Sequence, residues 1–377
     1  MQSKLYIVVN EDTFFLSHRK EVALIAMKAG YDVTIVSKDT GKKREIESLG
    51  LKMIDFPINP TGKNILQELL TFIFLFKLYK RNCTSIVHHV GLKNILWGGL
   101  AAKLTGVKGV VNAVSGLGIL FSQENISLLS RLVLSILRFS HNRKNVKVIF
   151  QNHEDESLFL KYHIVKNENV IFIKGSGVDL NQFVYQPELS DSIIKVIFSG
   201  RMLREKGPLV LIEAALLLQN EYKDRVQFLL CGGLSKNPKA IKEKDLLCHC
   251  DGNYIQWLGY REDIKTLLIR SHIVVYPSYY REGVPKSLIE AVAIGRPIIT
   301  TNSIGCRDTV EDGINGFLIP IKDSKALAEK LRILIDNAEL RNVMGMNSRK
   351  IAERYFSIND VLTKHLKIYN NFQISSA

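Results

Sequence analysis

The fold class of this 377-residue chain is decided by residues 273–300, which read IVVYPSYYREGVPKSLIEAVAIGRPIIT. The apolar run Ile273–Tyr276 predicts a buried strand, and residues 297–300 predict a second one. Pro285 lies between them and suits the first turn of a helix, where the N–H that proline lacks would have no intrahelical acceptor. The stretch therefore predicts a strand, a loop, a helix and a further strand, which is one unit of an α/β fold.

Two carboxylates flank the start of this helix. Glu282 lies on the predicted loop, and Glu290 lies eight positions later, more than one turn into the helix. The N–H groups of residues 284–287 form the positive end of the helix, which is a ready site for an anion. Such a turn suits the diphosphate of a sugar nucleotide, and a carboxylate can bind two vicinal ribose hydroxyls. The candidate turn residues are Gly283, Val284, Pro285, Lys286 and Ser287. Spacing alone also fits a plain strand–loop–helix unit with two solvated glutamates.

Residues 276–299 resemble a known enzyme family, the retaining glycosyltransferases of family 4. Those enzymes carry a Glu-x7-Glu motif followed by Glu-Ala and Gly-x-Pro. The matching residues are Glu282, Glu290, Ala291, Gly295 and Pro297. Three further blocks resemble the family in the same order: residues 175–183, 199–207 and 312–318. Together the blocks cover most of residues 170–320, whereas the N-terminal half is similar more loosely, through residues 14–19 and 114–118.

The resemblance implies the GT-B fold, in which two doubly wound, Rossmann-like parallel-sheet domains face a central cleft. It implies an N-terminal acceptor-binding domain over residues 1–174 and a C-terminal domain that binds the nucleotide sugar over residues 175–356. A C-terminal helix over residues 357–377 is expected to cross back to the N-terminal domain.

An alternation of short apolar runs with amphipathic stretches supports the same α/β fold class. The predicted strands of the first half are residues 5–9, 32–36, 85–90, 109–114, 146–151 and 170–173. Those of the second half are residues 195–198, 226–231, 255–258, 273–276, 297–300 and 317–319. Residues 17–29 are predicted to form one helix that stops at Gly30. Strands that alternate with helices predict parallel sheets covered on both faces, with ligands at the carboxyl ends of the strands.

Two basic residues follow the strand that opens the second half. Arg201 and Lys206 come after residues 195–199, so both side chains are expected to reach the strand ends and neutralise a diphosphate leaving group. The resemblance implies phosphate contacts for both of them. Arg204, between them, is expected to be solvated.

The resemblance also implies roles for the two glutamates and for one tyrosine. Glu290 is expected to bind the ribose hydroxyls, and Glu282 is expected to lie near the donor sugar and the reacting centre. Tyr260 follows the predicted strand 255–258, in a loop that packs on the nucleotide base in the family. The expected catalytic residues are therefore Glu282, Arg201 and Lys206.

The N-terminal half departs from the family pattern after its first strand. Many relatives have a Gly-Gly loop there, whereas residues 10–13 of this chain are Asn-Glu-Asp-Thr. His18 is expected at the start of a helix, where it either faces the acceptor or only caps that helix. Ser115 and Gly116 follow a predicted strand and can bring backbone close to a sugar.

No metal or other cofactor is expected. No Asp-x-Asp motif stands at a predicted strand end, and cationic side chains with a helix terminus can stabilise a departing phosphate without a divalent ion. Cys248-His249-Cys250 lacks a second ligand pair at zinc spacing. His88 and His89 end an apolar strand, where a structural role is expected. The absence of Gly-x-Gly-x-x-Gly after the first strand argues against a nicotinamide-dependent dehydrogenase.

The formal net charge of +14 calls for an anionic partner. Nucleic acid is not expected, because no RNA-binding or helix-turn-helix signature is present. Residues 126–147 combine apolar residues with five basic ones and no acid: Arg131, Arg138, Arg143, Lys144 and Lys147. Residues 65–81 are similar. A basic amphipathic helix can lie in the headgroup plane, so an anionic membrane surface is the expected partner. A core helix with a solvated basic edge is the alternative.

The expected cellular location follows from features that the sequence lacks. No secretory signal is present, the five cysteines are scattered, and the longest apolar run, residues 69–76, is well short of the roughly 20 residues of a membrane span. These features predict a cytoplasmic protein that associates peripherally with the inner face of the cell membrane.

The sequence and the resemblance together predict a retaining, metal-independent glycosyltransferase. The expected donor is a UDP-hexose or UDP-N-acetylhexosamine, and the expected acceptor is a lipid-linked saccharide in the assembly of O-antigen, lipopolysaccharide or capsule. Two alternatives remain open: a UDP-sugar 2-epimerase of the same fold, and a non-catalytic basic protein that binds membranes or nucleic acid.

Overall fold

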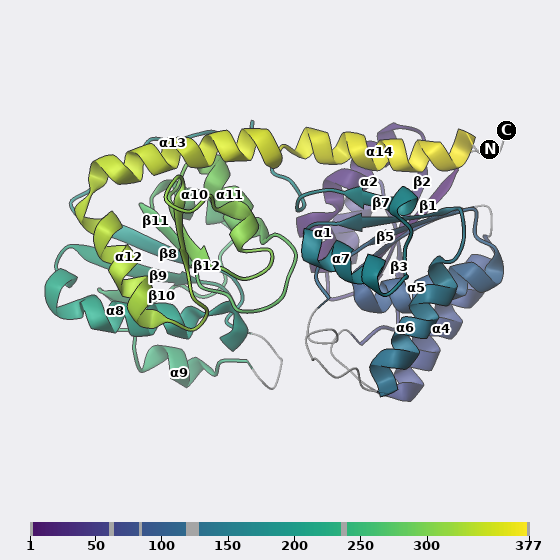
Figure 1. Cartoon of the computed structure of the whole chain (residues 1–377), viewed down its shortest axis with the longest axis horizontal. Coiled ribbons are helices and arrows are strands. Elements are labelled where there is room, and N and C mark those ends of the chain that lie inside the picture. The colour runs from purple at the N-terminus through teal and green to yellow at the C-terminus, as the bar shows by residue number, and fades with distance from the viewer. Residues whose placement is uncertain (1–2, 60–63, 83–84, 118–127, 235–239, 375–377) are drawn as a thin grey trace. The chain divides into compact units, whose positions relative to one another are not determined.

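The computed structural model describes residues 3–59, 64–82, 85–117, 128–234 and 240–374 (Figure 1). By its internal contacts the chain divides into two compact units. Unit 1 comprises Met1–Ser176 and Asn359–Ala377, and unit 2 comprises Gly177–Ile358. Each unit is built around its own parallel sheet and its own hydrophobic core.

A seven-stranded parallel sheet forms the centre of unit 1, in the order β3-β2-β1-β4-β5-β6-β7. Its strands are β1 (Lys4–Glu11), β2 (Asp32–Lys38), β3 (Lys52–Asp55), β4 (Ile86–Val90), β5 (Gly109–Ala113), β6 (Val146–Phe150) and β7 (Val170–Phe172). The central strands β4 and β5 are buried along their whole length, as expected where helices cover both faces. The strand order reverses between β1 and β4, the position where doubly wound sheets bind ligands.

Unit 2 contains a six-stranded parallel sheet in the order β10-β9-β8-β11-β12-β13. Its strands are β8 (Ile194–Ser199), β9 (Val226–Cys231), β10 (Ile255–Trp257), β11 (Ile273–Tyr276), β12 (Ile298–Thr301) and β13 (Gly316–Ile319). The order reverses between β8 and β11, so the loops after these two strands leave the sheet side by side.

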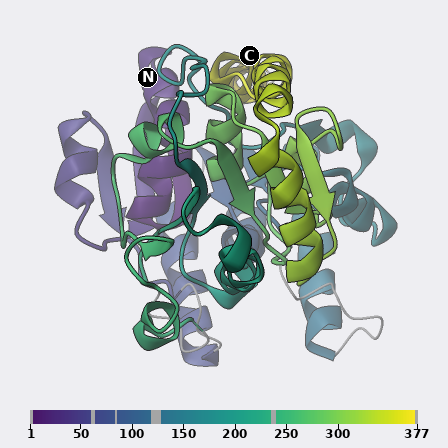
Figure 2. The ribbon, with the colours of Figure 1, turned by 90° about the vertical axis from the view of Figure 1, so that its left-hand side faces the viewer.

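Helices cover both faces of each sheet. Those of unit 1 are α1 (Asp12–His18), α2 (Lys20–Lys28), α3 (Lys43–Ser48), α4 (Ile65–Lys80), α5 (Leu92–Thr105), α6 (Leu128–His141), α7 (His153–Lys161) and α14 (Ile358–Ile374). Those of unit 2 are α8 (Pro208–Tyr222), α9 (Glu243–Leu247), α10 (Ile264–Ile269), α11 (Lys286–Ile294), α12 (Ser324–Asp336) and α13 (Ala338–Tyr355). In unit 2, α8 packs against α12, and α11 packs against α13. The turned view shows helices on either side of the sheet of unit 2 (Figure 2).

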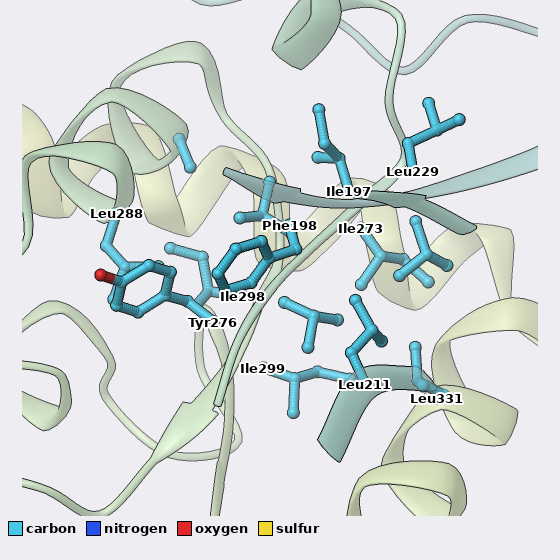
Figure 3. Packing of buried hydrophobic residues seen from close by; sticks show 14 of the residues in the cluster. Ile197, Phe198, Leu211, Leu229, Ile273, Tyr276, Leu288, Ile298, Ile299 and Leu331 are labelled. Atoms are coloured by element: carbon cyan, nitrogen blue, oxygen red, sulfur yellow. The ribbon is translucent and has the colours of Figure 1, made fainter. Parts of the chain in front are cut away.

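The core of unit 2 joins its sheet to both helix layers. Leu211 of α8, Leu288 of α11 and Leu331 of α12 are fully buried in one cluster with the side chains of the strands (Figure 3). In the same cluster the rings of Phe198 and Tyr276 stack with their centroids 5.4 Å apart. Burial of one such side chain stabilises the fold by about 1.5–3 kcal/mol, so this cluster holds the end of β11 in place.

The predicted fold class is confirmed, and the structure contains a strand near each of the twelve predicted ones. The sequence did not predict β3, because its four residues have charged ends and only Met53 and Ile54 are apolar. A short strand at the edge of a sheet carries too weak an alternation to be detected.

The single helix predicted over residues 17–29 is wrong. The structure forms α1 and α2 instead, with a break at Arg19, whose φ is −131°. The side chain of Arg19 is only 3% exposed and its Nε has no hydrogen-bond partner. Because of this break, the charged side chain of Arg19 is buried in unit 1. Gly30, with φ of +91°, follows the end of α2 as predicted.

The C-terminal helix α14 packs on unit 1 (Figure 1). The hydroxyl of Tyr369 lies 2.7 Å from Nδ1 of His88, and the hydroxyl of Tyr31 donates to Asn370 at 2.8 Å. Where the chain leaves unit 2, the amide of Val178 donates to Phe356 O at 2.8 Å and Ile358 donates back to Val178 O at 3.0 Å.

Candidate functional site

The loops that follow the parallel strands of unit 2 leave the sheet at its carboxyl edge. Two of them carry most of the predicted residues: the lysine loop, residues 200–207 after β8, and the glutamate loop, residues 277–285 after β11. Gly207 has φ of +82°, and a Cβ there would overlap the carbonyl oxygen of Pro277. Gly305, with φ of +87°, lies equally close to the carbonyl of Gly283. Both positions require glycine, because the loops approach one another through their backbones.

Lys206 and Glu282 form an ion pair at the centre of this edge. Lys206 lies in a short 3₁₀ turn, Arg204–Lys206, and is only 7% exposed. Its ammonium lies 5.5 Å from the ring centroids of both Tyr276 and Tyr280, which suits a cation–π contact. The sequence predicted both charged residues for the site but not their contact with each other.

The Glu282 carboxylate has further partners that the sequence analysis did not assign. The Ser278 hydroxyl lies 3.1 Å from Glu282 Oε1. Burial raises the pKa of Tyr276 well above its usual value, and the charge of Glu282 and a hydrogen bond with it add to this shift. Because the Tyr276 hydroxyl thus stays protonated, it can donate to the carboxylate. The only signal for these residues was their position, a Tyr-Pro-Ser run directly after a buried strand.

The other two cations of the lysine loop, Arg201 and Arg204, differ in their surroundings. Arg201 is exposed, directly beyond β8, and its charge opposes the rise in the pKa of Tyr276 and of Tyr280. Arg201 therefore lies in the electrostatic range of both rings. Arg204 is also exposed and pairs with Asp245 at 3.3 Å.

The helix α11 begins one residue later than the sequence predicted. Pro285 is its N-cap, with φ of −63° and ψ of 127°, rather than a residue of the first turn. The amides of Leu288 and Ile289 both donate to Pro285 O, at 3.1 Å, so these are the first intrahelical hydrogen bonds. Gly283 and Val284 are buried in the approach to this helix, and Ser287 is half-buried in its first turn. The positive end of α11 thus lies directly beyond the glutamate loop.

Glu290 lies in the second turn of α11, with its side chain 15% exposed. Burial raises the pKa of its carboxyl, and the Lys286 ammonium, 3.7 Å away, opposes that rise. A ligand that donates hydrogen bonds to this largely desolvated carboxylate replaces part of the hydration that burial removes.

Tyr260 is 73% exposed in the loop after β10. The carbonyl of the preceding residue, Gly259, accepts a hydrogen bond from the amide of Gly232 at 2.8 Å. This bond holds the Tyr260 loop against the loop after β9, at the same edge as the ion pair.

The candidates of unit 1 lie at the carboxyl edge of their own sheet. His18 is the last residue of α1, not the first residue of a helix, so the expectation that it might cap a helix start is wrong. Its ring stacks on Phe14 with centroids 4.4 Å apart, and its Nδ1 lies 2.6 Å from Ser17 Oγ. Ser115 and Gly116 follow β5, and Gly116 has φ of +104°. Gly118 of the same block lies outside the described residues.

The segment after β1 is fixed by Asp12, which opens α1. Its carboxylate accepts hydrogen bonds from the amides of Thr13 (2.7 Å), Thr40 (2.6 Å) and Lys42 (3.0 Å) and from the Thr40 hydroxyl. Burial alone would raise the pKa of Asp12, but these hydrogen bonds outweigh it and lower the pKa. Where many relatives have a glycine loop, this chain therefore has a helix tied to the loop after β2.

His89 belongs to a buried chain of side chains in unit 1. The Tyr79 hydroxyl lies 2.9 Å from His89 Nε2, His89 Nδ1 lies 2.7 Å from Asn112 Oδ1, and Asn112 Nδ2 lies 2.8 Å from His141 Nε2. His141 Nδ1 lies 2.8 Å from Leu137 O. Burial lowers the pKa of both histidines to about 4, so both are neutral at pH 7. Each group then has a donor facing an acceptor, as expected for a structural network.

Two helices of unit 1 expose large apolar side chains. They are Ile65, Leu66, Leu69 and Leu70 of α4, and Leu129, Leu132 and Phe139 of α6. Arg131 and Lys144 are exposed as well. Arg143, in contrast, forms hydrogen bonds within the protein. It donates to Ala102 O in α5 at 2.9 Å and to Val107 O just after α5. Residues 126–127 of the predicted amphipathic stretch lie outside the described residues.

The described residues contain neither a candidate membrane span nor a candidate metal cluster. No helix there is long and apolar enough to cross a membrane. No group of three or more His, Cys, Asp and Glu side chains there could hold a metal ion.

Family models match both halves of the chain. A model of the glycosyl transferase 4-like domain matches residues 4–152, and a model of group 1 glycosyl transferases matches residues 183–351. The second model spans the ion pair, the positive end of α11 and Glu290.

Three curated relatives align with nearly the whole chain. An alpha-1,3-N-acetylgalactosaminyltransferase of Campylobacter jejuni, named for N,N'-diacetylbacillosaminyl-diphospho-undecaprenol, is 27% identical over 90% of this chain and 91% of its own length. A UDP-Gal:alpha-D-GlcNAc-diphosphoundecaprenol alpha-1,3-galactosyltransferase of Escherichia coli is 27% identical over 87% and 86%. The capsular polysaccharide biosynthesis glycosyltransferase CapM of Staphylococcus aureus is 28% identical over 92% and 91%.

Solved structures share the fold over its full extent. A glycosyltransferase of Rickettsia africae has a TM-score of 0.77 at 22% identity and covers 99% of both chains. Anabaena Alr3699/HepE, solved with UDP and glucose, has a TM-score of 0.76 at 19% identity and covers 100% of both chains. Since the two models together span most of the chain in order, one on each doubly wound sheet, the chain is a glycosyltransferase of the GT-B fold, with a 4-like N-terminal domain and a group 1 C-terminal domain.

Proposed function

We propose that this protein is a retaining, metal-independent glycosyltransferase that moves a hexose or N-acetylhexosamine from a UDP-sugar to a lipid-diphosphate-linked saccharide during assembly of a surface polysaccharide. The observation that carries the proposal is the buried Lys206–Glu282 pair beside the positive end of α11. The printed names of two relatives support the lipid-diphosphate acceptor, and one of these names a UDP-linked donor.

The donor nucleotide is bound by unit 2. Lys206, Arg201 and the first turn of α11 hold the diphosphate, because cations and helix N-termini both attract phosphate. Glu290 accepts hydrogen bonds from the ribose hydroxyls, which compensates its desolvation. The Tyr260 loop lies against the base.

The transfer step replaces one bond at the anomeric carbon of the donor sugar with another on the same face. The bond to the phosphate oxygen breaks, the bond to the acceptor oxygen forms, and the acceptor proton passes to the departing phosphate oxygen. Lys206 and Arg201 stabilise the charge that develops on the diphosphate, so the chain's own cations can do the work of a divalent ion. Glu282 lies at the donor sugar and stabilises the positive charge on its ring.

The acceptor is bound by unit 1, with His18, Ser115 and Gly116 as candidates on the saccharide side. The exposed apolar residues of α4 and α6, with the exposed Arg131 and Lys144, suit an anionic lipid surface. We therefore place the protein at the cytoplasmic face of the cell membrane, where a lipid-linked acceptor is accessible. No nucleic-acid partner is proposed.

A donor screen tests this function directly. The purified protein is mixed with UDP-hexoses and UDP-N-acetylhexosamines, with and without a lipid-diphosphate sugar acceptor, and both UDP release and the glycosylated lipid are measured. One donor should give UDP release that depends on the acceptor. A UDP-N-acetylhexosamine converted to its 2-epimer without acceptor would favour the epimerase. Protein that binds vesicles but turns over no donor would favour the non-catalytic alternative.

A further inference from the structure

Ser278 joins the lysine loop to the glutamate loop. It is fully buried, and its Oγ lies 3.1 Å from Glu282 Oε1 and 3.1 Å from the carbonyl oxygen of Glu205. The amide of Tyr279 donates to the same Glu205 carbonyl at 2.9 Å, and the amide of Tyr280 donates to Ser278 Oγ at 3.3 Å. One small side chain is therefore in contact with both loops at once.

The position of Ser278 is fixed by its own backbone. Its carbonyl oxygen accepts hydrogen bonds from the hydroxyl of Thr301, the last residue of β12, and, at 3.0 Å, from the Ser303 hydroxyl beyond that strand. A serine hydroxyl has one proton to donate, and an ionised carboxylate is a stronger acceptor than a carbonyl. The Ser278 proton therefore belongs to Glu282.

The two oxygens of the Glu282 carboxylate have different partners. Oε2 pairs with the Lys206 ammonium, and Oε1 faces the Ser278 hydroxyl. In the proposed function the donor diphosphate also binds Lys206, and it carries more negative charge than one carboxylate. Donor binding therefore weakens the contact on Oε2 and leaves the contact on Oε1 unchanged.

We propose that Ser278 is a positioning residue, which keeps Glu282 oriented at the reacting centre once the diphosphate has drawn Lys206 toward itself. The inference rests on the proposed function and refines it. A carboxylate contributes to transfer only while it is held in the productive geometry, and a fixed donor on its far oxygen supplies that restraint. Ser278 contacts Glu282 and not the donor, so it acts on turnover and not on nucleotide binding.

The test compares Ser278→Ala with Ser271→Ala in the full-length protein. Ser278→Ala should lower kcat at saturating donor by about tenfold, the factor that one lost hydrogen bond to a charged group gives. UDP affinity, measured by calorimetry, should stay within about twofold of the parent. Ser271→Ala removes another buried serine hydroxyl of unit 2, which donates to the carbonyl of Leu267 and not to either loop of the site, so it should change neither quantity. Ser278→Thr keeps the hydroxyl and should retain most of the turnover.

A double-mutant cycle separates positioning from general stability. In a Glu282→Ala background, Ser278→Ala should cause no further loss of kcat, because a residue that acts through Glu282 has nothing left to position. Full turnover in Ser278→Ala, additive losses in the cycle, or an equal loss of UDP affinity would each overturn the inference. If Ser278→Ala does not fold, Ser278→Cys fills the same volume with a weaker donor and should show the same fall in kcat.

A crystal structure of Ser278→Ala with UDP gives a readout besides activity. The Glu282 carboxylate should leave the position that it holds in the parent complex, and an unchanged position overturns the inference even for a protein without measured turnover. If the parent itself transfers sugar from no UDP donor, the proposed function fails. If the parent is active and Ser278→Ala matches it, only the inference about Ser278 fails.

Discussion

The two units share one architecture but use their buried polar groups in opposite ways. In unit 2 the ion pair of Lys206 and Glu282 lies at the carboxyl edge of the sheet, where an anionic ligand can take the place of one partner. In unit 1 the polar chain through His89 is closed within the core, since each donor already faces an acceptor inside the protein. Exchangeable partners suit a binding site, whereas satisfied ones suit a rigid support.

The contrast extends to the loops at the strand ends. The loops of unit 2 approach one another through glycines such as Gly207 and Gly305, where backbone contacts backbone. The segment after β1 in unit 1 is held by hydrogen bonds to Asp12 instead. This difference suits the proposed function, in which unit 2 binds the donor nucleotide and unit 1 binds the acceptor.

The largest effect is expected from loss of the buried cation of unit 2. Lys206→Ala should weaken UDP binding by about 1.5–3 kcal/mol, because it removes a charge-assisted contact and leaves Glu282 facing the diphosphate without its counter-ion. Transfer should fall at least as far. Arg204→Ala is the matched control, since Arg204 pairs with Asp245 at the surface and should tolerate removal. Unchanged UDP affinity in calorimetry would show that Lys206 does not bind phosphate.

Replacing the two glutamates should impair different properties of the enzyme, UDP binding in one variant and turnover in the other. Glu290→Ala should weaken UDP binding by about tenfold, because it removes an acceptor for the ribose hydroxyls. Glu282→Ala should lower kcat by a similar factor while UDP affinity is at least retained, since Lys206 loses the carboxylate that competes for it. UDP titration and turnover at saturating donor measure both. Equal loss of UDP affinity in the two variants would end this division of roles.

Membrane binding tests whether the outer surface of unit 1 has a ligand of its own. Replacement of Lys80, Arg131 and Lys144 with Gln should release the protein from anionic vesicles, at about 1 kcal/mol for each charge. Arg143 is left in place because it caps α5. The control replaces three exposed lysines of unit 2: Lys223, Lys244 and Lys325. If both triple variants co-sediment with vesicles as the parent does at low salt, the exposed helices are only solvated.

The neutral histidines of unit 1 should make its stability depend on pH. His89 and His141 have folded pKa values of about 4, below the usual 6.5, so the unfolded chain binds more protons between these values. Stability is therefore full above about pH 6.5 and falls as the pH drops toward 4, by about 1 kcal/mol for each histidine at pH 5.5. Urea unfolding measures the free energy of unfolding of the parent and of His89→Gln at several pH values. This free energy should depend less steeply on pH in the variant.

The smallest effect is expected from metal removal. EDTA should leave transfer unchanged, because the cations of unit 2 are proposed to neutralise the departing diphosphate without a divalent ion. The same assay is run with added Mn²⁺ as a comparison. Activity that is lost in EDTA and restored by Mn²⁺ would require a metal site in addition to Lys206 and Arg201.

The candidate site of unit 2 could be predicted because each of its parts is local in sequence. Glu282 and Glu290 stand within one strand–loop–helix segment, and Lys206 directly follows a buried strand. Their contact could not be predicted in the same way, since Lys206 and Glu282 are 76 positions apart and meet only when β8 and β11 become neighbours. The signal for Ser278 was only its place in a Tyr-Pro-Ser run directly after a buried strand, and that run does not show which side chain its hydroxyl will meet.

Sequence patterns could not predict the buried polar contacts of unit 1. Asn112 was one polar residue in an apolar strand, and Arg19 stood inside an apparently continuous helix. Asn112 is explained by a partner from a distant segment, His141, whereas Arg19 is explained by a break in the helix at Arg19 itself. Apolar periodicity reports which face of an element is buried, but not which polar groups will meet there.

The position of α14 has a consequence for the order in which the protein is made. Tyr369 bonds with His88 across 281 positions, and Asn370 with Tyr31 across 339. A ribosome that has translated all seven strands of unit 1 must still produce the whole of unit 2 before this helix emerges. The unit whose synthesis starts first is therefore the last to be completed, and its uncovered surface must avoid aggregation during that interval.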